Sequence, residues 1–250
     1  MSNRWRLFYI LLLAAFFVLL MSFNQLWELV LGRIFPAEQE LIYPRAGLLQ
    51  LVGEHLLLVT LSSLAAVTAG AGIGIFVTRR AGREFLEPVG DLTSLAQTFP
   101  PVAILALAVS SLGFGWKPTV VALFLYSILP ILRNTVSGLE AVAPEVLEAA
   151  RGMGMTPAQR LVRIELPLAL PVILAGIRIS VVINVGTATI GAVIGAGGLG
   201  TPIIAGLVRE NPALVLQGAL AAALLAFSLD QLIAQVEKAL APAAGRRAGR

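Results

Sequence analysis

The sequence has no cysteine, a single histidine and few charged side chains. Charged residues make up 13% of the 250 residues. Without cysteine the chain can form neither disulfides nor thiolate metal sites, and His55 alone cannot complete a zinc motif such as H-E-x-x-H, which needs two histidines. A Walker A loop is absent too, because neither lysine, Lys117 or Lys238, follows a glycine. We therefore expect no metal ligation, no bound cofactor and no catalytic site in this chain.

Hydrophobic residues, in contrast, form 58% of the chain, against about 45–50% in soluble domains. A water-soluble fold of this size could not bury so much apolar surface. Crossing the hydrocarbon core of a bilayer takes about 20 apolar residues in a helix. We predict an all-α integral membrane protein that forms one domain over residues 1–250, with six transmembrane helices at about residues 7–31, 56–78, 89–112, 119–132, 168–194 and 213–236.

Prolines interrupt or shorten two of these predicted spans, and the first span has an alternative explanation. We expect Pro130 or Leu132 to end the fourth span early, and the pair Pro100–Pro101 to break the third. The first run could be a signal peptide. It is longer than the apolar core of such peptides, about 7–15 residues, and no small-x-small cleavage site follows Met21.

The distribution of basic residues predicts the orientation. If the N terminus is cytoplasmic, thirteen of the 18 Lys and Arg residues face the cytoplasm and four face outward, while Arg178 lies within a span. The positive-inside rule then places both termini in the cytoplasm. Although the pI is near 10.1, the basic residues lie between apolar runs and form no single solvated patch, so we expect no nucleic-acid partner.

The longest connection, residues 133–167, lies on the predicted cytoplasmic side and reads as two short helices. Pro144 suits a first helical position and Glu145 the positive end of the helix dipole. We expect this first helix to run to Arg151 and to end at Gly152 and Gly154.

A second short helix is predicted to begin at Thr156. Thr156, Pro157 and Gln159 supply an N-cap, a first-turn proline and the amide of a capping box. This helix should lie at the membrane surface and lead into the fifth span through Pro167 and Pro171. From these features alone, a hairpin with a purely structural role remains an alternative.

Residues 148–171, EAARGMGMTPAQRLVRIELPLALP, resemble the EAA loop of bacterial ABC importer permeases. The match covers the Glu-Ala-Ala at 148–150, the glycine at 154 and the Leu-Pro at 166–167. In that family the short helix of the loop docks in a cleft of an ATP-binding subunit. The resemblance implies a coupling function for Glu145, Glu148, Ala149, Ala150, Arg151, Gly152 and Gly154. We expect the two alanines to form a flat face, and the glycine turn to set the angle between the two helices.

A glycine-rich segment follows the fifth predicted span. Its glycines fit the dinucleotide fingerprint G-x-G-x-x-G, but they follow a membrane helix rather than a strand, and no acidic residue lies about 20 positions on. We predict a tight re-entrant or extracellular turn where backbones approach closely. The segment GAGGLG also resembles one near the outer gate of methionine and osmoprotectant ABC permeases, which implies a gate at Gly195, Gly197, Gly198 and Gly200.

Several polar or irregular positions inside the predicted spans are candidates to line a solute path. Polar groups in spans are costly and are often functional, although Thr and Asn also hold helices together. The candidates are Gln97, Thr98, Phe99, Pro100, Pro101, Asn184, Thr187 and Thr189.

Four further predictions concern structure. Arg178 and Asp230, on adjacent spans, are expected to pair. Gly70 and Gly74 are expected to pack against a neighbouring helix. Glu54 and His55 could form a proton relay, but we expect a hydrated pair at the membrane interface. Phe99 and Trp116 could form an aromatic cage, but interfacial aromatic belts are the more common arrangement.

Two further segments, residues 123–142 and 182–203, resemble the permeases that import glycine betaine, choline or carnitine. This resemblance implies a type I ABC importer permease in the bacterial cytoplasmic membrane, surrounded by lipid. The implied partners are a second permease subunit, ATP-binding subunits that hold ATP and Mg, and an external solute-binding protein. Transport would proceed by alternating access.

Three alternatives remain. One is a permease of the same architecture for methionine or another amino acid. A second is an ion-coupled secondary transporter, which should need intramembrane carboxylates, and only Asp91 and Asp230 qualify. A channel or scaffold is the third.

Overall fold

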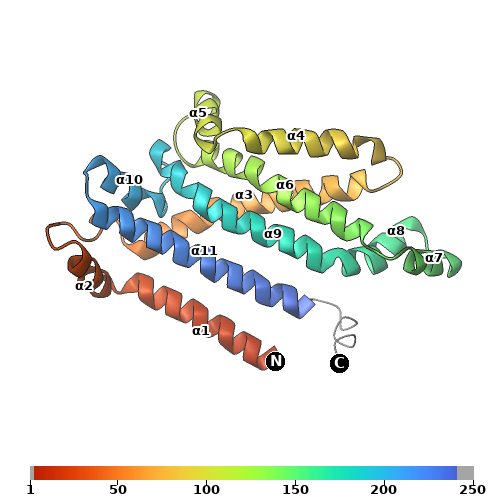
Figure 1. Ribbon diagram of the computed structural model, residues 1–250, viewed down its shortest axis with the longest axis horizontal. Helices are drawn as coiled ribbons and strands as arrows, with labels where there is room; N and C mark the ends of the chain where they lie inside the picture. The colour runs from red at the N-terminus through yellow and green to blue at the C-terminus, as the bar shows by residue number, and fades with distance from the viewer. Residues whose placement is uncertain (1–2, 241–250) are drawn as a thin grey trace.

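A computed structural model describes residues 3–240, with side chains from residue 8 onward. Residues 1–2 and the basic tail 241–250 lie outside this range, so the predicted position of the two chain ends is not addressed by it. Within the described part all regular structure is helical, as predicted. The long helices lie side by side, with two short helices, α7 and α8, at one end and α2, α5 and α10 at the other (Figure 1).

Four helical stretches are long and apolar enough to cross a membrane by themselves. One of them is continuous from Pro157 to Ile194, because α8, a π-helical turn, α9 and a 3-10 turn follow one another without a break. The main helices of these four stretches are α3 (Leu48–Val77), α6 (Trp116–Glu140), α9 (Leu166–Ala188) and α11 (Pro212–Leu240).

Small residues bring these helices together. A Cβ atom added to Gly74 of α3 would lie 2.8 Å from the Thr135 Cβ of α6, and one added to Gly70 would lie 3.1 Å from the Ile131 side chain. A Cβ atom added to Gly176 of α9 would be closer still, 2.6 Å from the Asn134 Cβ of α6. The predicted close packing at Gly70 and Gly74 is therefore confirmed. The resulting contacts place α6 against both α3 and α9, and α11 against α9.

Two pairs of helices meet at sharp bends and reach membrane length only when each pair is counted together. The first pair bends by 68° and the second by 94°. The first consists of α1 (Asn3–Ser22) and α2 (Asn24–Ile34), and the second of a 3-10 turn (Arg83–Phe85) with α4 (Leu86–Thr98) and α5 (Pro101–Leu112).

The bend after α4 confirms the predicted break at Pro100–Pro101. The predicted first span, residues 7–31, is made of two helices rather than one, because the helix breaks at Phe23. After the break, α2 turns onto the core: Trp27 and Leu31 are buried, and Trp27 Nε1 donates to Leu20 O at 3.0 Å. Neither proline nor glycine stands at this break, so tertiary packing decides it.

The prediction of a short fourth span is also wrong, since α6 continues through Pro130 to Glu140. Proline has no N–H to donate to the carbonyl four residues earlier, which here belongs to Tyr126. Gln97 Nε2 of α4 donates to that carbonyl at 2.8 Å. The unpaired backbone group is thus satisfied by a neighbouring helix, and α6 does not end at the proline.

Other helix ends differ from expectation. The second long helix begins at Leu48 rather than near residue 56, and the connection before the fifth begins after Glu140 rather than at residue 133. A short helix that was not predicted, α10 (Gly200–Val208), follows the glycine-rich segment and packs on α11.

Candidate functional site

The connection between α6 and α9 forms a hairpin of α7 (Pro144–Gly152) and α8 (Pro157–Arg160), at the right of Figure 1. Pro144 and Glu145 occupy the first turn of α7, as predicted. Gly154 has a φ of +76°, a conformation that glycine adopts without strain. Because Met155 N–H donates to Ala150 O at 3.1 Å, the chain reverses directly after α7.

The predicted capping box of α8 is confirmed. Gln159 N–H donates to Thr156 Oγ1 at 3.3 Å, and Thr156 N–H donates to Gln159 Oε1 at 2.9 Å. However, α8 does not end before the next span. It continues through a π-helical turn, Leu161–Glu165, directly into α9.

The outward surface of α7 has an apolar stripe. Val146, Ala149 and Met153 follow one another at spacings of three and four, which places them on one helical face. All three are exposed, Met153 by 71%. We call these three residues the α7 stripe. Three charged side chains of α7 are exposed as well: Glu145, Glu148 and Arg151. Glu148 and Arg151 line a cleft on the other side of the helix.

One detail of the prediction for α7 is wrong. The two alanines do not share an outward face, because Ala149 is exposed whereas Ala150 is fully buried inside the chain. Successive helical residues point about 100° apart, since 3.6 residues make a turn. Ala150 therefore holds α7 against the rest of the chain, and Gly152 and Gly154 lie exposed at its end.

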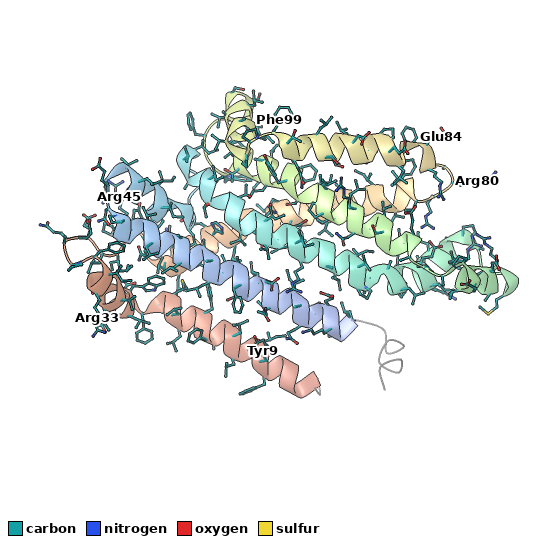
Figure 2. The ribbon with its side chains drawn as sticks, viewed as in Figure 1. Tyr9, Arg33, Arg45, Arg80, Glu84 and Phe99 are labelled. Carbon is teal, nitrogen blue, oxygen red and sulfur yellow. The ribbon has the colours of Figure 1, made fainter. Side chains whose placement is uncertain are left out.

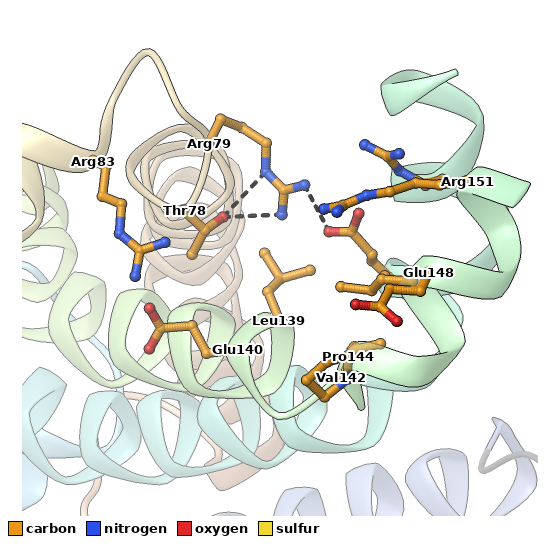
Figure 3. A pocket seen from close by; sticks show the side chains of 12 residues that line it. Thr78, Arg79, Arg83, Leu139, Glu140, Val142, Pro144, Glu148 and Arg151 are labelled. Carbon is orange, nitrogen blue, oxygen red and sulfur yellow. Dashed lines mark hydrogen bonds and ion pairs between the residues drawn. The ribbon is translucent and has the colours of Figure 1, made fainter. Parts of the chain in front are cut away.

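Behind α7 lies a cleft of about 620 Å³ that reaches the ends of α3 and α6. Figure 3 shows Arg79 and Arg83 on one side of it and Arg151 on the other. Arg79 Nη1 forms an ion pair of 2.6 Å with Glu165 Oε2, at the end of the π-helical turn. This pair therefore joins the end of α3 to the base of the hairpin.

At the opposite end of the molecule, the glycine-rich segment is held by two side chains of α3. Gly198 N–H donates to Glu54 Oε2 at 2.9 Å, and Leu199 N–H donates to His55 Nδ1 at 3.2 Å. His55 Nε2 lies 2.9 Å from Val185 O of α9. Since a carbonyl can only accept, Nε2 carries the hydrogen. Nδ1 accepts from Leu199 N–H and carries none, so the ring is neutral. We call Glu54, His55 and residues 197–199 the outer cluster.

The backbone of the segment requires glycine. Gly195, Gly197 and Gly198 all have positive φ, between 75° and 81°. A Cβ at Gly197 would lie 2.5 Å from Glu54 Oε2, and one at Gly198 would lie 2.9 Å from His55 Nδ1. The predicted close approach of backbones is confirmed at Gly200, where an added Cβ would overlap the backbone carbonyl of Thr189. The expectation of a hydrated Glu54–His55 pair is wrong, because His55 has no exposed surface.

The polar candidates of α4 and α9 have different environments. Gln97 is committed to the carbonyl of Tyr126, and Tyr126 Oη donates to Phe99 O, so both residues hold the bend between α4 and α5. Phe99 lies at this bend with an exposed ring, and Thr98 is exposed beside it (Figure 2). Pro100 caps α5 and Pro101 begins it.

In α9, Asn184 is fully buried, and its Nδ2 donates to Ser62 and Ser63 of α3 at 3.1 and 3.0 Å. Asn184 therefore joins two helices and does not reach an open surface here. Thr187 and Thr189 are partly exposed, and Thr189 Oγ1 donates to Gly186 O.

The predicted intramembrane pair is confirmed. Arg178 Nε and Nη2 donate to the two carboxylate oxygens of Asp230 at 2.5 and 2.7 Å. The pair joins α9 to α11.

Arg79 and Glu165 were missed by the sequence reasoning. The spacing indicated a buried position for Glu165, because it lies four residues from both Leu161 and Ala169, on the helical face that packs inward. A carboxylate on such a face requires a partner.

The chain was compared with known proteins. Residues 62–242 match the family described as "Binding-protein-dependent transport system inner membrane component". The osmoprotectant import permease protein OsmY of Salmonella typhimurium is 46% identical over 199 residues, which cover 79% of this chain and 84% of that protein. The choline transport system permease protein OpuBB of Bacillus subtilis is 40% identical over 194 residues, covering 78% of this chain and 88% of that protein.

A solved structure has a similar fold. The inward-facing MetNI methionine ABC transporter contains a chain that superposes with a TM-score of 0.68, covering 78% of this chain and 96% of its own length. The sequence identity is 23%, so the likeness concerns the fold.

Proposed function

Because the chain belongs to the family of binding-protein-dependent transport system inner membrane components, we propose that it is the permease subunit of an ATP-driven importer. Its solute is a small osmoprotectant such as glycine betaine, choline or carnitine. Relatives of 38–46% identity named for osmoprotectant, choline or glycine betaine/carnitine/choline transport support this solute class. Glycine betaine is a zwitterion and choline a cation, so the shared chemistry is the quaternary ammonium group.

The proposed topology is a single domain with six spans and both ends in the bacterial cytoplasm. Four long helical stretches support this topology, and the number of apolar crossings reaches six if each of the two bent pairs is one span. The excess of basic residues on the α7–α8 side supports a cytoplasmic position for the hairpin.

The observation that carries the proposed coupling function is the α7 stripe. Exposed apolar groups on one face of a helix at the tip of a hairpin are typical of a helix that docks into a groove on another protein. We propose that Ala149 enters this groove, that Glu145, Glu148 and Arg151 bind its rim, and that Ala150, Gly152 and Gly154 set the angle of α7. The occupant is the ATP-binding subunit, which holds ATP and Mg.

A gate is proposed at the glycine-rich segment. The bonds from Gly198 and Leu199 to Glu54 and His55, which join this segment to α3, support the proposal. The proposed path runs past Thr98, Phe99, Thr187 and Thr189 toward Gly195, Gly197, Gly198 and Gly200. Pro100 and Pro101 fix the bend beside the path, while Gln97 and Asn184 support it through the bonds described above. A second permease subunit completes the path, and an external solute-binding protein delivers the solute.

Transport follows from the way these parts are joined. When the ATP-binding subunits approach each other, α7 moves with them, and the movement reaches α9 through the continuous helix from Pro157. The far end of α9 leads into the glycine-rich segment, so a tilt of this helix shifts the gate. Hydrolysis on the partner subunit reverses the movement.

The test is reconstitution of the full complex in liposomes with candidate ATP-binding and solute-binding subunits. We expect glycine betaine uptake that depends on ATP enclosed in the liposome, on the side that corresponds to the cytoplasm. The variant Gly154→Val places a branched side chain at a φ of +76° and should abolish uptake while ATP hydrolysis continues. Gly72→Ala in α3, outside the hairpin, is the control, because an added Cβ there meets nothing within 4 Å. Full uptake by Gly154→Val would contradict the coupling function.

The same liposomes distinguish the alternatives. Uptake of methionine but not of glycine betaine would identify an amino-acid permease. Uptake that follows a proton gradient and ignores ATP would identify a secondary transporter. Of the two carboxylates considered for proton coupling, Asp230 is engaged by Arg178, which favours the ATP-driven importer.

A further inference from the structure

We propose that the Arg79–Glu165 ion pair is a positioning link that carries movement of the α7–α8 hairpin to α3. The proposal rests on the proposed importer function and adds to it a second route of transmission. The chain itself connects the hairpin to α6 and α9. It gives the hairpin no covalent connection to α3, the helix whose far end holds the glycine-rich segment through Glu54 and His55.

The geometry of the pair suits such a link. The two charged atoms are 2.6 Å apart, and the Glu165 side chain is only 8% exposed. The Arg79 guanidinium is also bound on the side away from Glu165, because its Nε and Nη2 donate to Thr78 Oγ1 at 3.3 and 3.1 Å. Thr78 Oγ1 in turn donates to Ile75 O in the last turn of α3. The arginine is therefore oriented by the end of α3, and the dashed lines from Arg79 in Figure 3 trace these bonds.

The surrounding apolar contacts differ in kind from this link. Ile75 of α3 packs against a small apolar core formed by Leu139, Ala169 and Ile173, together with Leu161. Apolar contacts are not directional, so helices in such a core can slide over one another. A hydrogen-bonded ion pair has a preferred geometry, and a shift of Glu165 therefore pulls or pushes the end of α3.

The position of Glu165 strengthens the argument. Residues 161–165 form the π-helical turn between α8 and α9. Such turns are rare and are often found at functional sites, because their wider hydrogen-bond pattern interrupts regular α-helix. Glu165 thus lies at the junction between the hairpin and α9, and Arg79 ties that point to α3.

The test measures coupling in the reconstituted complex as glycine betaine imported per ATP hydrolysed. Removal of either partner, by Arg79→Gln or Glu165→Gln, should lower this ratio about fivefold or more, the lower end of coupling between protein sites. ATP hydrolysis should continue. The exchanged pair Arg79→Glu with Glu165→Arg should restore at least part of the ratio. Arg80→Gln is the matched control, because Arg80 is the exposed neighbour in the same turn (Figure 2).

The outcomes separate the two proposals. Wild-type protein without ATP-dependent uptake would overturn the importer function itself. If the wild type transports and the single variants keep the wild-type ratio, or lose uptake and hydrolysis in equal proportion, the link is overturned while the importer function stands. Should the glutamine variants fail to assemble, Arg79→Lys keeps the charge but not the guanidinium geometry, and an unchanged ratio in that variant would likewise overturn the link.

Discussion

Replacement of Gly198 by alanine is expected to destabilise the outer cluster for two separable reasons. The residue has a φ of +75°, and a side chain in this left-handed region costs about 1–2 kcal/mol. In addition, the new Cβ would lie 2.9 Å from His55 Nδ1 and 3.2 Å from its Cα. Overpacking of this kind costs about 1–3 kcal/mol. Because His55 is buried and bonded on both ring nitrogens, it cannot move aside freely.

Two other glycines isolate these contributions. Gly195 has a φ of +77°, and a Cβ there meets nothing within 4 Å, so Gly195→Ala should cost only the backbone strain, about 1–2 kcal/mol. Gly186 lies in α9 with an ordinary φ and open space around its Cα. Gly186→Ala should therefore stabilise the chain by about 0.5–1 kcal/mol, as alanine does in helices.

The free energy of unfolding can be measured by titrating SDS into detergent micelles and following helical circular dichroism. The expected order of stability is Gly186→Ala, wild type, Gly195→Ala and then Gly198→Ala. If Gly198→Ala were as stable as Gly195→Ala, the contact with His55 would not restrict the segment. If Gly195→Ala matched the wild type, the strain argument itself would be refuted.

Two further predictions concern the packing of the long helices and use the same unfolding measurement. Gly74→Ala should destabilise the chain by about 1–3 kcal/mol, since its Cβ would lie 2.8 Å from Thr135. Gly72→Ala, whose Cβ would meet nothing within 4 Å, should not. Equal stabilities of the two variants would count against close contact between α3 and α6. The double change Arg178→Gln with Asp230→Asn should cost less than the sum of the two single changes, because either single change leaves the other side chain without its bidentate partner. Glu237, 4.0 Å from Arg178, replaces that partner only in part. Strictly additive effects in this double-mutant cycle would show that the pair contributes no coupling.

Features with local causes could be predicted from the sequence. Pro144 and the pair Thr156–Gln159 determine how α7 and α8 begin, because a first-turn proline and a capping box act within one helical turn. The break at Pro100–Pro101 is equally local. The glycines of the outer segment also predict a tight turn, since no other residue adopts a left-handed backbone as readily.

Features that depend on distant partners could not be predicted in this way. α6 passes Pro130 because a donor from α4 reaches the carbonyl of Tyr126, 29 positions away from Gln97 in the chain. The pair Glu54–His55 looks interfacial next to its neighbours in sequence, yet its bonding partners lie 144 residues further on. The break at Phe23 has no sequence breaker, because the burial of Trp27 and Leu31 determines where α2 goes.

The candidate site shows the same division. The position of the α7–α8 hairpin follows from residue types close together in the chain. Which of its residues face outward depends on how it packs, so Ala149 and Ala150 separate although they are adjacent. The ion pair of Glu165 with Arg79 joins residues on two different helices, and only the inward-facing period of the helix indicated that a partner was needed.

The uninterrupted helix from Pro157 to Ile194 has a consequence for how such chains can vary. Its 38 residues span about 57 Å at 1.5 Å per residue. One inserted or deleted residue would turn everything beyond it by about 100°, so that the two extremities would no longer face their respective neighbours. Amino-acid identities at the apolar positions of this helix can drift as long as they remain apolar, but the number of residues is constrained from both extremities at once. Chimaeras that exchange one half of it will therefore work only when the count of residues is conserved.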